Sequence, residues 1–245
     1  MPDKGGMMNP YDELALEEAL QIREEHGGTV TAISFGAAHC KKVVRTALAM
    51  GADKGIFILD EINEIDEADE PLTGLDLAHC FAHLVKSLPF DLILAGYQSL
   101  DTGNSVVGPA LAELLNIPNI SMVIEQEIKN NKIHCRQQME KGCQVMEAPL
   151  PALITTESGL NTPRYVSLPG IRRAKQKPLE IIRLEDIKPY LTWPDKSSLQ
   201  RIGFARMEQD RAQKIITEGE PWEKAQTLSN WLWNTEKMKQ KPAIS

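Results

Sequence analysis

Two hydrophobic patterns alternate along the first half of the chain. Apolar residues at every third or fourth position are typical of helices that cover a core, and short continuous apolar runs are typical of buried strands. These patterns predict helices at 10–26, 38–50, 75–85 and 106–115, and strands at 29–34, 55–59 and 91–95. Helices that alternate with buried strands predict an α/β fold, in which a doubly wound, mostly parallel sheet is covered on both faces. Asn9 and Pro10 mark the start of the first helix, with Asn9 expected to cap it.

The pattern changes after the fourth helix. Asn130-Asn131 separates two strand-like runs, and such a pair favours a hairpin turn. We therefore expect an antiparallel hairpin excursion and then a return to the main sheet, with strands at 119–126, 132–139, 143–147 and 152–156.

The C-terminal part lacks the strand pattern. Past Ile181 no further strand is predicted, and a helix is expected to open at Pro221 and continue through Leu232. Trp231 and Trp233 cannot both face one narrow apolar stripe, so this segment is expected to pack on the body of the protein or on a partner. The sequence thus predicts a nucleotide-binding α/β domain at 1–182 and a C-terminal arm with a helix at 183–245.

Composition limits the function classes. The 245 residues include 27 basic and 34 acidic side chains, a net charge of −7, which argues against a nucleic-acid partner because such proteins present a basic face. No apolar run approaches the roughly 20 residues that cross a bilayer, so membrane insertion is not expected. The first eight residues lack the apolar core of a secretory signal, and we expect a cytoplasmic protein.

Self-contained catalytic motifs are missing from the sequence. The four cysteines match no disulfide framework or zinc spacing, and there is no P-loop, Gly-x-Ser-x-Gly or Gly-x-Gly-x-x-Gly motif. His79 and His83 share the i, i+4 spacing of zinc enzymes, but no Glu adjoins His79 and no third ligand is evident, which favours an ordinary helix surface. We expect no catalytic residue and no metal, and hence no self-standing enzyme.

Two loops follow predicted strands at the edge where open α/β sheets bind ligands. They are Ser34-Phe35-Gly36 and the segment 96–108, which is rich in Gly, Ser, Thr and Asn and leads directly into a helix. Such a loop can direct backbone N–H groups and a helix dipole toward a phosphate. It can equally be a plain connection built from turn-forming residues.

Five separated blocks of the sequence form one combined motif. They are Asn9-Pro10-Tyr11-Asp12 with Leu16-Glu17-Glu18-Ala19, residues 45–53, Gly96-x-Gln98-x-x-Asp101 with Gly108, Leu150-Pro151-Ala152, and Asn161-x-Pro163-Arg164-Tyr165-x-x-Leu168-Pro169 with Ala174-Lys175. In this order they resemble the beta (small) subunit of electron-transfer flavoproteins. Val107-Gly108-Pro109, the turn at 24–28 and the segment 216–221 resemble the bacterial and archaeal bifurcating or nitrogen-fixation-associated branch more than the mitochondrial type.

The resemblance implies a fold like that of the adenine nucleotide α-hydrolases and a heterodimer with a larger alpha subunit, on which the C-terminal arm would pack. The alpha subunit would hold or share a redox FAD, and the beta subunit would hold AMP or a second FAD. Carried over by position, the cofactor-binding residues are Asn9, Pro10, Tyr11, Asp12, Phe35, Asp101, Thr102, Gly103, Asn104, Ser105, Val106, Val107 and Gly108.

The resemblance also implies a docking segment for the partner, a flavin dehydrogenase such as an acyl-CoA dehydrogenase. Arg164, Tyr165 and Leu168 would contact that partner, with Leu168 as the aliphatic anchor. Burying one Leu side chain contributes about 1.5–3 kcal/mol, and basic neighbours would steer the encounter. The alternative is that Leu168 folds into the core of this chain.

The sequence departs from the family pattern in two places. The family's usual first strand is not found before Asn9, and the loss of a central strand would leave backbone groups unpaired. The family loop Asp-Gly-Asp-Thr-x-Gln-Val-Gly-Pro reads Asp-Thr-Gly-Asn-Ser-Val-Val-Gly-Pro at 101–109. The resemblance implies an electron carrier that passes electrons between a flavin dehydrogenase and downstream acceptors. Two other hypotheses stay open: a non-redox adenine-nucleotide-binding regulatory module on the same fold, and a truncated chain.

Overall fold

The computed structural model describes residues 6–61, 72–191 and 215–234. The chain forms two compact units, Met1–Gln200 and Arg201–Ser245, which are considered separately below. The acidic stretch at 62–70 and Trp193-Pro194, which lies within the predicted C-terminal arm, are outside the described residues.

The first half of the larger unit alternates helices and strands, as the hydrophobic pattern predicts. Its elements are α1 (Pro10–His26), β1 (Thr31–Gly36), the 3-10 helix η1 (Ala38–Cys40), α2 (Lys41–Met50), β2 (Lys54–Leu59), α3 (Gly74–Val85), β3 (Leu92–Gly96) and α4 (Val107–Leu115).

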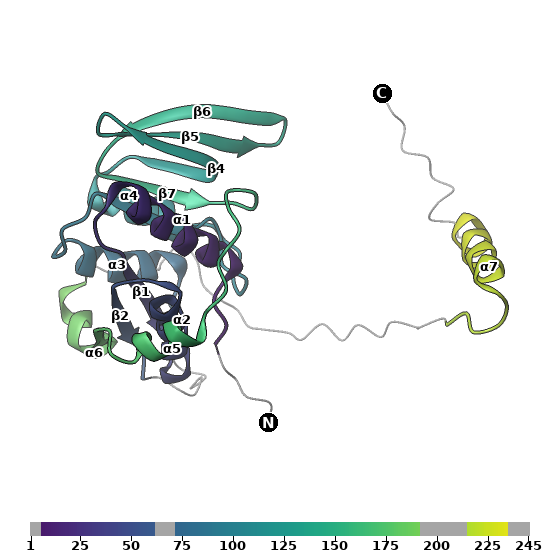
Figure 1. The fold of residues 1–245 in the computed structure, drawn as a ribbon, viewed down its shortest axis with the longest axis horizontal. Coiled ribbons are helices and arrows are strands. Elements are labelled where there is room, and N and C mark those ends of the chain that lie inside the picture. Colours follow the sequence, from purple (N-terminus) through teal and green to yellow (C-terminus); the bar gives the residue numbers. More distant parts are fainter. Residues whose placement is uncertain (1–5, 62–71, 192–214, 235–245) are drawn as a thin grey trace. The chain divides into compact units, whose positions relative to one another are not determined.

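The second half begins with the predicted antiparallel excursion, which leaves the sheet after α4 and returns at β7 (Figure 1). The remaining elements of this unit are β4 (Asn119–Lys129), β5 (Lys132–Met139), β6 (Gly142–Pro149), β7 (Ala152–Thr156), α5 (Leu168–Ala174), β8 (Leu179–Arg183), α6 (Leu184–Ile187) and the 3-10 helix η2 (Lys188–Tyr190).

The strands form two sheets, with the orders β1-β2-β8 and β3-β7-β4-β5-β6. All pairs are parallel except β4 with β5 and β5 with β6, so the predicted mostly parallel sheet with an antiparallel excursion is confirmed. Within the described part of the chain no strand joins β1 to β3, and each of these two strands has a single hydrogen-bonded neighbour.

Helices cover both faces of β2, whose alternate residues point to opposite sides and are buried on each. On one face, Ile56 and Ile58 of β2 pack against Cys80 and Leu84 of α3. On the other face, a side chain at Gly55 would collide with Val44 of α2. The doubly wound arrangement therefore rests on strand residues that are buried on both sides.

The elements between β7 and the end of the larger unit, among them α5 and β8, were not predicted. Strand β8 pairs with β2 at the edge of its sheet and exposes Glu180, Ile181 and Arg183. An edge strand of this kind lacks the continuous apolar run by which the buried strands are recognised. Immediately after β8, Leu184 and Ile187 of α6 are buried against β2 and α3.

The smaller unit contains the predicted C-terminal helix, α7 (Pro221–Asn234). Its large apolar side chains are exposed, among them Trp222, Leu228 and Trp233. None of the helices in the described part of the chain has the length and apolar content needed to span a bilayer.

Candidate nucleotide-binding site and docking segment

The first turn of α1 is bonded to the carboxyl ends of β3 and β7. The Gly96 amide donates to Asp12 Oδ1 at 2.7 Å, and Thr156 Oγ1 donates to the Tyr11 carbonyl at 2.8 Å. Gly96 and Thr156 are register partners in the β3–β7 pair. The amino end of α1 is thereby held at the sheet edge where ligands of open α/β proteins bind.

Close contact at this edge requires a glycine. A Cβ atom built on Gly96 would lie 2.7 Å from Tyr11 Cβ and 2.9 Å from the Asp12 nitrogen. Any side chain at this position would push the first turn of α1 away from β3.

The Asn9 side chain does not cap α1, contrary to the sequence-based prediction. Its Nδ2 donates instead to Asp12 Oδ2 and to the Gln98 carbonyl, both at 2.9 Å. Its Oδ1 is buried without a hydrogen-bond partner among the described residues. Such an acceptor is expected to find a donor, which a ribose hydroxyl or an adenine amino group can provide.

Two tyrosines stack beside this contact, and the sequence analysis missed the second of them. The rings of Tyr11 and Tyr97 meet edge to face with centroids 4.5 Å apart, and Tyr97 Oη donates to Tyr11 Oη at 3.5 Å. This hydrogen bond is the main cause that raises the pKa of Tyr97 to about 12. Tyr97 comes almost directly after the predicted strand at 91–95. Its position beyond a strand end could have marked it as a candidate site residue.

The loop at 101–106 turns sharply above the start of α4. Asp101 Oδ1 accepts the Thr102 amide at 2.6 Å, and hydrogen bonds from Ser99 and Thr102 lower the pKa of Asp101. Gly103 and Ser105 both have positive φ angles, of 61° and 54°. The first five residues of the loop are exposed.

The same loop also touches α3. A Cβ atom on Gly74, the first residue of α3, would meet the side chain of Asn104 at 3.2 Å and that of Val106 at 3.5 Å. Gly108 is pressed against Thr155 of β7, and Phe35 packs with the core between β2 and α3. Gly108 and Phe35 therefore have packing contacts that are independent of any ligand.

The amino ends of α1 and α4 share one property that suits an anion. Neither Asn9 nor Val106, at their N-cap positions, forms a side-chain cap, whereas Thr73 caps α3 and Ser167 caps α5. The helices α2 and α6 also begin without a side-chain cap, but the amino ends of α1 and α4 are the ones that contact β7. First-turn amides without side-chain acceptors, at the positive end of a helix dipole, are suited to bind phosphate. The residues present therefore fit the phosphate part of a nucleotide. No Lys or Arg is among the predicted pocket residues, so amides would supply most of the positive potential.

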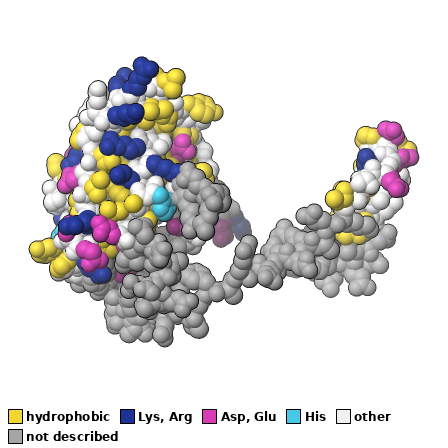
Figure 2. Space-filling model, turned by 90° about the horizontal axis from the view of Figure 1, so that it is seen from below, with side chains coloured by type: hydrophobic (Ala, Val, Ile, Leu, Met, Phe, Trp, Pro, Cys, Tyr) yellow, Lys and Arg dark blue, Asp and Glu magenta, His cyan; other side chains and the backbone are white. Residues whose placement is uncertain are grey.

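The predicted docking residues lie in a separate region, at the start of α5. Tyr165 is 100% exposed and Leu168 is 77% exposed, so Leu168 does not fold into the core. Figure 2 views the larger unit from the side of α5 and α6 and shows Lys and Arg side chains interspersed with hydrophobic ones. Arg164 differs from its neighbours, because its guanidinium forms ion pairs with Glu17 at 2.8 Å and Glu24 at 2.6 Å within this chain.

Comparison with known proteins identifies the family. The electron transfer flavoprotein domain matches residues 2–187. The electron transfer flavoprotein subunit beta of Bacillus subtilis is 40% identical over 227 residues, which are 92% of this chain and 85% of the relative. The proteins of the same name from Syntrophomonas wolfei and Bos taurus are 33% and 34% identical, over 96% and 78% of this chain and 87% and 77% of the relatives.

The chain belongs to the electron transfer flavoprotein beta subunit family.

Its role is that of an electron transfer flavoprotein beta subunit, and members of this family are electron carriers. The family is associated with flavin, as its name states. The names of the relatives do not separate the branches of the family, so the predicted bifurcating or nitrogen-fixation-associated branch stays a prediction.

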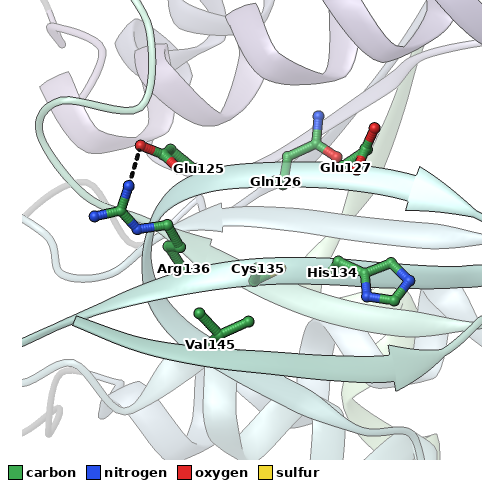
Figure 3. A pocket seen from close by; sticks show the side chains of 7 residues that line it. All are labelled: Glu125, Gln126, Glu127, His134, Cys135, Arg136 and Val145. Atoms are coloured by element: carbon green, nitrogen blue, oxygen red, sulfur yellow. Dashed lines mark hydrogen bonds and ion pairs between the residues drawn. The ribbon is translucent and has the colours of Figure 1, made fainter.

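A shallow hollow on the antiparallel excursion of the beta subunit lies apart from both regions (Figure 3). Glu125, Glu127, His134 and Arg136 are among its lining residues, and Arg136 Nη1 pairs with Glu125 Oε1 at 2.6 Å. Two acidic residues of the hollow form ion pairs on the excursion itself, Glu125 with Arg136 and Glu127 with Lys129. Gln126 Oε1, also in the lining, is buried without a hydrogen-bond partner among the described residues.

The histidines that the spacing singled out lie on α3. The ring of His83 stacks on Tyr190 with centroids 6.1 Å apart. No group of three His, Cys, Asp or Glu side chains that could hold a metal ion is found in the described part of the chain.

Proposed function

We propose that this beta subunit pairs with an electron-transfer flavoprotein alpha subunit and holds an adenine nucleotide between the amino ends of α1 and α4. In this role it passes electrons between a flavin dehydrogenase, such as an acyl-CoA dehydrogenase, and downstream acceptors in the cytoplasm. The observation that carries the proposal is that two helix amino ends without side-chain caps lie against the carboxyl end of β7, α1 through the Thr156–Tyr11 bond and α4 through the contact of Gly108 with Thr155. The FAD held by or shared with the alpha subunit supplies the redox chemistry.

The residues of this chain have binding and positioning roles in the proposal. The first-turn amides of α1 and α4 would contact phosphate, and the buried Asn9 Oδ1 would accept a hydrogen bond from the nucleoside. Thr156 and Gly96 would hold the amino end of α1 in place for this purpose. The bound nucleotide would be AMP or a second FAD.

Two exposed apolar regions, one around Leu168 and one on α7, would contact different partners. Leu168 and Tyr165, beside the basic residues of α5, would dock the dehydrogenase, because an exposed Leu gains about 1.5–3 kcal/mol on burial. The apolar side chains of α7 would pack on the alpha subunit, as part of the C-terminal arm predicted at 183–245.

Co-expression with the alpha subunit tests the proposal. We expect a yellow heterodimer that releases FAD together with AMP, or FAD in excess of one per heterodimer, when the nucleotides are identified by mass spectrometry. A stable colourless monomer that retains only AMP or ATP would favour a non-redox regulatory module. A chain that stays insoluble even with the alpha subunit would contradict the proposed pairing.

A further inference from the structure

Helix α1 carries two consecutive buried carboxylates. Glu17 is 3% exposed and Glu18 is 5% exposed, although ionised side chains are rarely buried unless they are paired. Consecutive helical residues point about 100° apart, so the two carboxylates reach different partners. Both sets of partners include the irregular segment that precedes α5.

Glu17 binds Arg164 through main chain and side chain. Its Oε2 accepts the Arg164 backbone amide at 3.1 Å and Nε at 2.8 Å, and its Oε1 accepts Nη2 at 2.9 Å. Burial by itself would raise the pKa of Glu17, but the hydrogen bonds from Arg164 and Gln21 outweigh it and lower the pKa. Glu17 is therefore a charged, multiply bonded anchor for this point of the segment.

Glu18 binds the same segment three residues earlier. Its Oε2 accepts Asn161 Nδ2 at 2.7 Å, and its Oε1 accepts Gln126 Nε2 from β4, also at 2.7 Å. Asn161 Nδ2 donates in addition to the Leu14 carbonyl of α1 at 3.0 Å. The two carboxylates thus hold the segment on both sides of residues 162 and 163.

The segment has no helix or strand of its own. Between β7 and α5, residues 157–167 contain one turn and otherwise irregular backbone. Tyr165, directly after Arg164, is fully exposed, and Leu168 follows at the start of α5. An irregular segment that ends in exposed side chains needs external anchors to keep one conformation, and Glu17 and Glu18 provide them.

We infer that Glu17 and Glu18 are positioning residues for docking, which hold residues 161–164 so that Tyr165 and Leu168 are presented in the conformation that the dehydrogenase binds. The inference rests on the proposed docking through Leu168. A pre-organised segment does not lose conformational freedom on association, so loosening it weakens docking. Electron transfer within the docked complex is unaffected, because neither carboxylate lies in the candidate nucleotide site.

The test uses the purified heterodimer as electron acceptor for an acyl-CoA dehydrogenase. We expect Glu17→Gln and Glu18→Gln to raise the KM for the heterodimer by about tenfold and to leave kcat within about twofold. Glu25→Gln, an exposed glutamate on the same helix, is the matched control and should change neither constant. Hydrogen exchange of residues 158–166 should accelerate in the two variants while that of β2 does not.

The variant Leu168→Ala separates the proposed docking site from the proposed role of the two carboxylates. If Leu168→Ala raises KM and the two glutamine variants do not, the inference about the carboxylates is wrong and the docking site stands. If Leu168→Ala leaves KM unchanged, the docking site itself is wrong. Should Glu17→Gln fail to fold, Arg164→Lys and Asn161→Ala replace it, and an unchanged KM in both would overturn the inference.

Discussion

Two adjacent buried threonines on β7 provide a matched test of the candidate nucleotide site. Thr156 Oγ1 donates to the Tyr11 carbonyl in the first turn of α1 at 2.8 Å, whereas Thr155 Oγ1 accepts the Met122 amide of β4 at 3.0 Å. Both side chains are at most 2% exposed. Substitution of either residue by Val keeps the shape of the side chain and removes its hydroxyl group. The two variants therefore differ in the element whose hydrogen bond is lost, α1 for Thr156→Val and β4 for Thr155→Val.

The two substitutions should have similar effects on stability. Loss of one buried hydrogen bond costs about 1–2 kcal/mol, including the group left unpaired. For a unit of this size that corresponds to a fall in Tm of about 2–8 °C. Calorimetry of the two variant heterodimers measures this change and confirms that the perturbations are matched.

Nucleotide affinity should separate the two variants. Thr156→Val removes the bond between β7 and the first turn of α1, while the Gly96–Asp12 bond to β3 remains. We expect the loosened turn to lose one amide–phosphate hydrogen bond, which costs about 1.5–3 kcal/mol, or roughly 10–150-fold in Kd. Thr155→Val leaves α1 attached and should keep the Kd within about twofold. Equal weakening in both variants, measured by titration of nucleotide-free heterodimer, would refute the assigned role of α1.

The remaining predictions concern other parts of the molecule. Gly96→Ala should destabilise the beta subunit by about 1–3 kcal/mol, because its Cβ overlaps Tyr11, and urea unfolding should show a lower midpoint at unchanged slope. Tyr97 should ionise near pH 12 in a spectrophotometric titration, and Tyr11→Phe should bring that value toward 10; an unchanged value would contradict the role of the hydrogen bond. Because the pKa of Glu17 is lowered from 4.5 in the folded state, its stabilisation is present above pH 4.5 and is lost as pH falls through the folded value, so the free energy of unfolding should depend less on pH below 4.5 in Glu17→Gln than in the parent chain. Trp222→Ala and Trp233→Ala should weaken association with the alpha subunit, measured by sedimentation, with little change in the stability of the larger unit.

The sequence predicted the elements whose hydrophobic pattern follows from burial on both sides. The strands β2 and β7 contain the apolar runs Ile56–Leu59 and Ala152–Ile154, because both strands are buried. The edge strand β8 was not predicted, since its exposed residues break that run. The short helix α5 was not predicted either. It follows an irregular segment that is anchored by carboxylates distant in the sequence, and a local hydrophobic pattern cannot predict such contacts.

The candidate site was predicted only in outline. The loops at the carboxyl edge follow from the order of strands and helices, and the family resemblance named their residues. The roles of Gly96 and Thr156 could not be predicted, because each acts through a contact with α1 about 85 or 145 residues away. Asn9 lies at the N-cap position of α1, but the prediction that its side chain caps the helix was wrong, because that side chain bonds to Gln98 and Asp12 instead.

A high-resolution structure of the heterodimer with its alpha subunit tests the central claim most directly. The account predicts a nucleotide at the carboxyl edge of β3 and β7, with phosphate oxygens within hydrogen-bonding distance of first-turn amides of α1 or α4. The account would be contradicted if those amides were bonded to side chains of either subunit and the nucleotide were bound elsewhere or absent from the beta subunit.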